Sequence, residues 1–82
     1  MRIKIACFGV LHTVFDAPER EIELPGESAR VDEVLDRLAS DYPAFSAHRR
    51  HTACAVGDRL VDRDSRLAAG DTLVLLPPVS GG

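Results

Sequence analysis

The sequence predicts an α+β domain with one mixed sheet of four to five strands and one main helix packed across one face of it. Three observations support this prediction. Residues 2–10 and 20–25 alternate in polarity, as half-buried strands do. Residues 31–38 instead repeat apolar side chains at helical spacing, and short apolar runs return after residue 52. The expected order of elements is therefore β-β-α-β-β-β.

The first two strands are expected to pair as antiparallel neighbours. In residues 2–10, Ile3, Ile5 and Cys7 share one face of the strand. Residues 11–19 are expected to form an irregular connection. Residues 20–25 make the second strand, which the turn Pro25-Gly26 ends.

The helix is predicted because the spacing of apolar residues changes from every second residue to the three- and four-residue spacing of a helix. Its apolar stripe repeats at i, i+3, i+4 and i+7 and consists of Val31, Val34, Leu35 and Leu38. Ser28 is a plausible N-cap, whereas Arg30 would be a poor one. Pro43 is expected to end the helix, and residues 44–50 to add one more helical turn.

The remaining strands are predicted at residues 52–56, 60–61 and 72–76, separated by turns that contain Gly-Asp. The first and last strands are expected to lie side by side and parallel in the middle of the sheet, as in ubiquitin-like β-grasp domains. Residues 1–76 would form this domain, and residues 77–82 an extended C-terminal Gly-Gly tail.

Composition narrows the function. The 82 residues suffice for one small domain, and a net charge of −3 with scattered basic residues disfavours nucleic acid as a partner. The chain has no apolar run of about 18 residues and no signal-peptide pattern, so we expect a cytoplasmic protein without a membrane partner. Cys7 and Cys54 are expected to be buried thiols, with a structural disulfide as the alternative.

The face of the sheet opposite the helix should be polar but is predicted to be apolar. It would carry Ala6, Phe8, Ala53, Ala55, Val74 and Leu76. An exposed apolar patch on a small domain marks a partner surface. The alternative is a register slip of one residue, which would exchange the two faces.

The last six residues, "PPVSGG", are the strongest functional signal. Pro77 and Pro78 stop the last strand and favour an extended path, along which Val79 and Ser80 follow. Gly81 and Gly82 lack a Cβ atom and can enter a channel too narrow for side chains. We therefore expect the terminal carboxylate of Gly82 to be the reactive group, delivered into another protein's active site.

A carboxylate must be activated before it reacts as an acyl donor. The sequence has no phosphate-binding loop, so ATP would be used by a separate enzyme, and this chain would bind no cofactor itself. His48 and His51 could share one side of a helical turn, but a third ligand is missing, and no metal site is predicted.

The whole chain resembles the MoaD/ThiS family of sulfur carriers, which are ubiquitin-like β-grasp proteins, in the branch that serves molybdopterin synthase. The resemblance rests on "IKIACFG", "VDEVLDRLASDYP", "ACAVGDRLV" and "LAAGDTLVLLPPVSGG". The most specific part is the apolar strand followed by "PPVSGG".

This resemblance implies that an E1-like, MoeB-type enzyme adenylates Gly82 and that the adenylate becomes a thiocarboxylate. The tail would then enter the large catalytic subunit of molybdopterin synthase, in a heterotetramer, and give its sulfur to cyclic pyranopterin monophosphate. The chain itself would be a non-catalytic subunit. Residues expected at the partner surface are Phe8, Val74, Leu75 and Leu76.

Two alternatives of different kinds remain open at the level of sequence. The chain could carry sulfur in a thiamin-type or cysteine-type pathway. It could also be a protein modifier that is conjugated through Gly82, although Lys4 is the only lysine that a chain of such modifiers could use.

Overall fold

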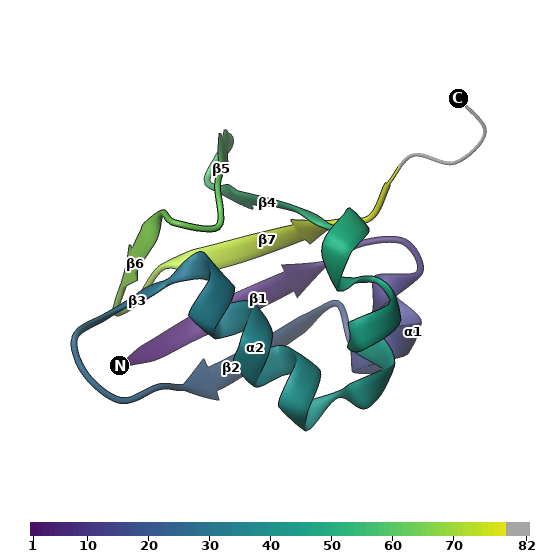
Figure 1. The fold of residues 1–82 in the computed structure, drawn as a ribbon, viewed down its shortest axis with the longest axis horizontal. Coiled ribbons are helices and arrows are strands. Elements are labelled where there is room, and N and C mark those ends of the chain that lie inside the picture. Colours follow the sequence, from purple (N-terminus) through teal and green to yellow (C-terminus); the bar gives the residue numbers. More distant parts are fainter. Residues whose placement is uncertain (79–82) are drawn as a thin grey trace.

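The structure, a computed structural model, describes residues 1–78. Five strands form one mixed sheet in the order β2-β1-β7-β4-β5 (Figure 1). Their bounds are Arg2–Cys7 for β1, Glu19–Glu23 for β2, Ala53–Val56 for β4, Arg59–Val61 for β5 and Thr72–Leu76 for β7. The main helix, α2, spans Val31–Asp41. The predicted fold class, a ubiquitin-like β-grasp domain, is confirmed.

The middle of the sheet is the predicted parallel pair of the first and last strands. Ile5 lies opposite Leu73, and Cys7 lies opposite Leu75. β2 pairs with β1 in antiparallel fashion, and β4 pairs in the same way with both β7 and β5. The register therefore places β7 between two strands along most of its length, so that the chain's last strand is held firmly in the sheet.

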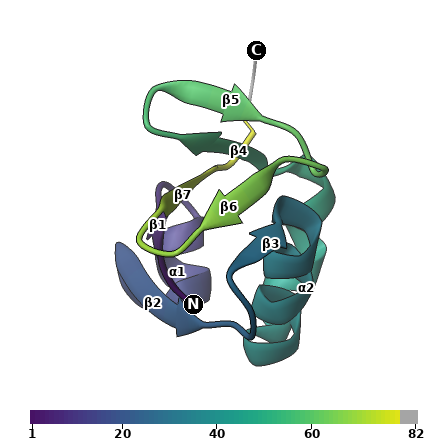
Figure 2. The same ribbon diagram turned by 90° about the vertical axis from the view of Figure 1, so that its left-hand side faces the viewer.

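Helix α2 lies on one side of the sheet (Figure 2) and buries the predicted stripe completely. It begins at Val31, and the predicted N-cap Ser28 is wrong because this residue lies in a strand. Arg30 takes the N-cap position, and its backbone N–H donates to a carboxylate oxygen of Glu33 at 2.9 Å. This hydrogen bond is the main reason that the pKa of Glu33 is lowered.

The end of the helix and the segment after it agree with the sequence. The N–H of Tyr42 donates to the carbonyl of Leu38, and Pro43 follows at once. Two short 3₁₀ helices, η1 (Pro43–Ala47) and η2 (Arg49–His51), replace the single helical turn that was expected over residues 44–50. Phe45 from η1 is fully buried and closes the core at this end.

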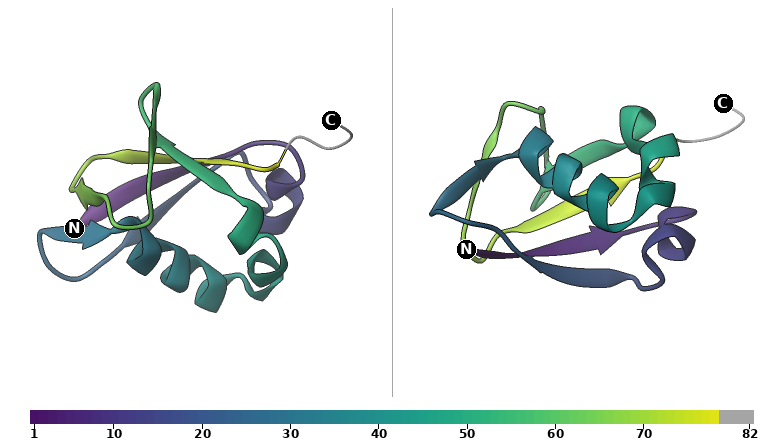
Figure 3. Two further views of the ribbon diagram at one scale, coloured as in Figure 1. Left: turned by 45° about the horizontal axis from the view of Figure 1, so that its top comes forward. Right: turned by 60° about the horizontal axis from the view of Figure 1, so that its bottom comes forward.

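Three elements were not predicted. The segment expected to be an irregular connection contains a short helix, α1 (Leu11–Phe15), because Leu11 and Phe15 are both fully buried four residues apart. In addition, β3 (Ser28–Arg30) and β6 (Arg66–Ala68) form a separate two-stranded sheet. Figures 1 and 3 place this small sheet at the end of the domain remote from the end of β7.

No helix within residues 1–78 is both long enough and apolar enough to span a bilayer. The predicted boundary between the domain and the tail stays a prediction beyond Pro78, because Val79, Ser80, Gly81 and Gly82 lie outside the described residues.

Candidate functional site: the open sheet face and the start of the tail

The face of the sheet opposite α2 carries an apolar row that crosses four strands. Ala6 lies opposite Val74, Val74 opposite Ala55, and Ala55 opposite Leu60. A second, shorter row joins Leu76 to Ala53. Because residues that are directly opposite in a sheet share a face, these side chains form one surface, which we call the open face. The predicted register is therefore correct.

The apolar residues at this surface differ in how much of each side chain is exposed to solvent. Leu60 is 70% exposed, and Phe8, which follows β1 and lies outside the paired rows, is 51% exposed. Val74 and Leu76 are half-buried, and Ala55 is buried between its two larger neighbours on the face. Large apolar side chains at this exposure gain little from the fold of the isolated domain, so the open face is suited to contact with a partner.

Leu75 does not belong to this surface. Its side chain is fully buried on the helix side of the sheet, between Cys7 of β1 and Cys54 of β4. The prediction that Leu75 contacts a partner is therefore wrong, because neighbouring residues of a strand point to opposite faces. Of the four predicted surface residues, Phe8, Val74 and Leu76 remain.

The start of the tail lies against a loop from the other end of the sequence. β7 ends at Leu76, after which Pro77 is half-buried and Pro78 is exposed. Gly9 has a φ of +61°, and a Cβ atom built on it would lie 3.0 Å from Cγ of Pro77. The loop after β1 therefore approaches the first proline closely, and Gly9 allows this approach because it has no side chain.

Helix α1 is the element that holds this loop in place, and sequence analysis missed it. Leu11 and Phe15 anchor the helix in the core, and the ring of Phe15 lies 5.2 Å from that of Phe45 between centroids. The backbone N–H groups of Leu11 and His12 donate to the carbonyls of Phe8 and Gly9. The spacing of Leu11 and Phe15 was the signal that could have revealed the helix.

The two thiols are structural. Cys7 and Cys54 are both free and buried, as the sequence predicted. They flank Leu75 from opposite sides, which puts two strand spacings, about 10 Å, between them, too far for a disulfide. Burial raises the pKa of Cys7 to about 11 and raises that of Cys54 as well. Both thiols are therefore protonated near neutral pH and are poor nucleophiles.

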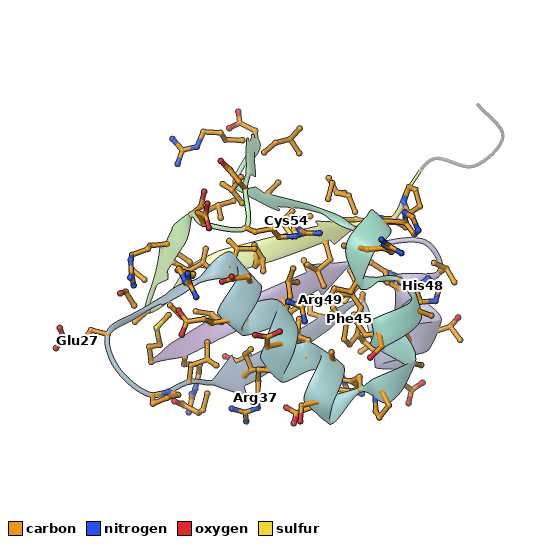
Figure 4. The ribbon with its side chains drawn as sticks, in the orientation of Figure 1. Glu27, Arg37, Phe45, His48, Arg49 and Cys54 are labelled. Carbon is orange, nitrogen blue, oxygen red and sulfur yellow. The ribbon has the colours of Figure 1, made fainter. Side chains whose placement is uncertain are left out.

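The remaining predicted groups do not converge on a reactive centre within residues 1–78. His51 is exposed and His48 is half-buried on the connection between α2 and β4 (Figure 4). In the same part of the chain, no group of three or more histidine, cysteine or acidic side chains is placed to hold a metal ion. The described residues instead provide the open face and fix the position of Pro77, where the tail begins.

Comparison with known proteins gives consistent results. The sequence pattern that defines the ThiS family matches residues 6–82. The molybdopterin synthase sulfur carrier subunit of Chlamydomonas reinhardtii is 28% identical, with full coverage of both chains. The protein of the same description from Mycobacterium tuberculosis is 25% identical, over 100% of this chain and 99% of that relative.

Solved structures agree in fold. A Pyrococcus furiosus protein assigned to molybdopterin converting factor subunit 1 is 26% identical, with a TM-score of 0.84 over 96% of this chain and 99% of that one. SAMP1 from Haloferax volcanii is 27% identical, with a TM-score of 0.83 and full coverage of both chains. A chain from the complex of subunits 1 and 2 of the molybdopterin-converting factor of Helicobacter pylori is 25% identical, with a TM-score of 0.68 and full coverage of both.

Proposed function

Because this chain belongs to the ThiS family, we propose that it is the sulfur carrier subunit of a molybdopterin synthase, with Gly82 as the residue that carries the sulfur. The observation that supports this proposal most is similarity over the full chain to sulfur carrier subunits, with the C-terminal Gly-Gly included in the match. The sulfur carrier role is the part that the relatives share.

The proposed chemistry takes place at the terminal carboxylate. An oxygen of the Gly82 carboxylate attacks the α-phosphate of ATP, and pyrophosphate leaves. Sulfide sulfur then attacks the carbonyl carbon of the acyl-adenylate, AMP leaves, and a thiocarboxylate results. The thiocarboxylate sulfur bonds to a carbon of cyclic pyranopterin monophosphate and displaces an oxygen substituent, and water then cleaves the bond between this sulfur and the Gly82 carbonyl carbon, which leaves the sulfur on the pterin and restores the Gly82 carboxylate. Each molybdopterin contains two dithiolene sulfurs, so two loaded carriers are consumed.

In this proposal the chain supplies the acyl group at Gly82, and partner proteins catalyse its reactions. Cys7 and Cys54 are buried with raised pKa values and cannot serve as sulfur relays. Because the sequence has no phosphate-binding loop, activation would belong to a separate MoeB-type enzyme that binds ATP. The open face, with Val74 and Leu76, and the exposed Phe8 after β1 would contact the large catalytic subunit while the tail enters its active site. The Helicobacter pylori relative, whose structure is a complex of subunits 1 and 2, supports such a partner.

The test is an intact mass of the protein isolated from cells that make molybdopterin. We expect a fraction heavier by about 16 Da, because sulfur replaces oxygen at the terminus. Deletion of Gly82 should leave the unfolding transition unchanged and abolish sulfur transfer to cyclic pyranopterin monophosphate with the purified large subunit. A truncated chain that still supports transfer would contradict the proposal.

The second candidate function is conjugation to target proteins through Gly82. The likeness to SAMP1, a protein described as a small archaeal modifier, is the observation that favours it. Lys4, the only lysine of the chain, is exposed on β1 and is the one lysine to which a second copy could attach. Covalent adducts of high mass that survive denaturant, without the thiocarboxylate fraction, would favour this candidate over the sulfur carrier.

A further inference from the structure

The tail leaves the domain between two segments that are distant in sequence. Leu76, the last residue of β7, lies opposite Ala53 of β4, so the end of η2 is close to the point where the tail begins. On the other side, Gly9 approaches Pro77. Residues 8–15 and 43–53 therefore surround the start of the tail, and we call this end of the domain the tail exit. Figure 1 shows α1 and the 3₁₀ helices at this end.

The charge at the tail exit is opposite to that of the whole chain. The sequence has 13 Asp and Glu residues and a net charge of −3, yet residues 8–15 and 43–53 contain no acidic residue. These two segments also hold all three histidines of the chain, together with Arg49 and Arg50. Cationic and imidazole side chains are thus gathered where the tail begins, and the carboxylates belong to other segments.

Among these side chains, Arg50 and His51 are neighbours on η2 that are free to meet a partner, and His12 on α1 is exposed as well. Arg49 is engaged within the domain, because its guanidinium donates to the carboxylate of Asp36 and to the carbonyl of Asp32. Arg50 and His51 are exposed, and neither side chain has a hydrogen bond or ion pair within residues 1–78. The turn that presents them is fixed by buried Thr52, whose hydroxyl donates to the carbonyl of His48 at 2.7 Å.

We propose that Arg50 and His51 contact carboxylates on the rim of the partner pocket that receives the tail. The inference rests on the proposed function, because it assumes that the tail is the delivered segment. A charge acts over a Debye length of about 8 Å at physiological ionic strength. The charge of Arg50 therefore acts on the partner surface that closes around the tail exit, and the imidazole of His51 beside it can donate a hydrogen bond there; together they would speed association and orient the docked domain.

An acidic protein surface fits these residues better than a polyanion does. Nucleic acid needs a basic stripe several phosphates long, whereas the tail exit offers one free arginine and one neighbouring histidine. The rest of the chain has a strong excess of carboxylates, which would repel a long polyanion. A small cluster of carboxylates on a docked protein needs only the local contact that Arg50 and His51 provide.

The experiment compares two charge reversals of equal size. Arg50→Glu changes the tail exit, and Arg59→Glu is the matched control. Arg59 is exposed on β5 and lies opposite Val56, so its side chain points away from the open face. The affinity and association rate of each variant for the purified large subunit of molybdopterin synthase are measured in about 50 mM and about 300 mM NaCl.

We expect Arg50→Glu to raise the Kd about tenfold at the lower salt concentration and less than about threefold at the higher one, mainly through slower association. The double variant Arg50→Glu/His51→Glu should raise the Kd further. The Kd of Arg59→Glu should stay within about twofold of that of the wild type. The inference would be overturned if the Kd of Arg50→Glu were unchanged, or if Arg59→Glu weakened binding equally. It would also be overturned if the loss of affinity in Arg50→Glu did not depend on salt.

Three further outcomes separate this inference from its alternatives. If a labelled single-stranded oligonucleotide binds the wild type but not Arg50→Glu, and affinity for the large subunit is unchanged, the residues serve nucleic acid and the inference is wrong. A wild type that shows the expected salt pattern but transfers no sulfur would refute the proposed function alone. A wild type that does not bind the large subunit would refute both.

Discussion

Gly9 and Pro77, 68 positions apart in the sequence, meet at the start of the tail: a Cβ atom on Gly9 would lie 3.0 Å from Cγ of Pro77. The contact links the loop after the first strand to the residue that follows the last one. Since β1 and β7 are parallel neighbours, both strands end at the same edge of the sheet, and the loop of one lies beside the tail of the other. The direction in which the tail begins is therefore set by two segments.

Gly9→Ala should destabilise the domain and displace the start of the tail. Any L-residue at a φ of +61° costs about 1–2 kcal/mol, and the new methyl group would also press on Pro77. Gly57→Ala is the matched control, because Gly57 has a φ of +65° but nothing within 4 Å of the added Cβ. Urea unfolding should show a larger loss for Gly9→Ala, accompanied by weaker binding to the large subunit. Equal losses in stability would mean that the contact with Pro77 has no energetic effect.

Phe8→Asp should weaken partner binding without unfolding the domain. The side chain is 51% exposed in the isolated chain, so its replacement should change the free energy of unfolding by less than about 0.5 kcal/mol. A buried carboxylate in the docked complex would raise the Kd for the large subunit by more than about tenfold. Titration calorimetry and a thermal melt measure the two effects separately. A variant that fails to fold would show that Phe8 belongs to the core.

Leu75→Ala and Leu76→Ala should differ although the residues are adjacent. Leu75 is fully buried, and its truncation should cost about 2–5 kcal/mol of unfolding free energy. Leu76 is half-buried on the open face, so its truncation should cost less stability and should weaken partner binding. Urea unfolding, combined with binding measured on the folded fraction, distinguishes the two. The reverse pattern would contradict the assignment of the two faces.

Stability should fall as the pH rises through the range in which the thiols titrate. In the unfolded chain Cys7 loses its proton near its ordinary pKa of 9.0, whereas in the folded domain burial raises the pKa to about 11. Between these values the unfolded state binds fewer protons, so its formation becomes more favourable. The free energy of unfolding, measured between pH 8 and 11, should fall more steeply in the wild type than in Cys7→Ala/Cys54→Ala. Parallel curves would show that the thiols do not contribute.

The sequence predicted the elements whose residues repeat regularly. The alternation in β1 and β2 and the stripe on α2 are local patterns, and they depend on which face of each element is buried. The same alternation predicted that Val74 and Leu76 share the open face. The same alternation already implied that Leu75 is not a surface residue, since a residue between Val74 and Leu76 must point to the helix side.

The elements that were missed are short and depend on contacts distant in sequence. β3 and β6 have three residues each and exist because Ala29 lies opposite Leu67. Helix α1 has five residues, too few to be stable alone, and the burial of Leu11 and Phe15 holds it in place. The N-terminus of α2 also depends on contacts distant in sequence, because the N–H groups of Val31 and Asp32 donate to the carbonyls of Ser65 and Arg63.

The sequence by itself determined the fold class and the apolar character of the open face, because both are written in residue type and local spacing, and it contains the Gly-Gly end on which the proposed function rests. Only the tertiary structure decided what surrounds the start of the tail. Gly9, Arg50 and Pro77 belong to three separate segments, and the pairing of β1 and β4 with β7 brings these segments to one end of the sheet. Strand pairing between distant segments depends on the packing of the whole core, which no local pattern specifies.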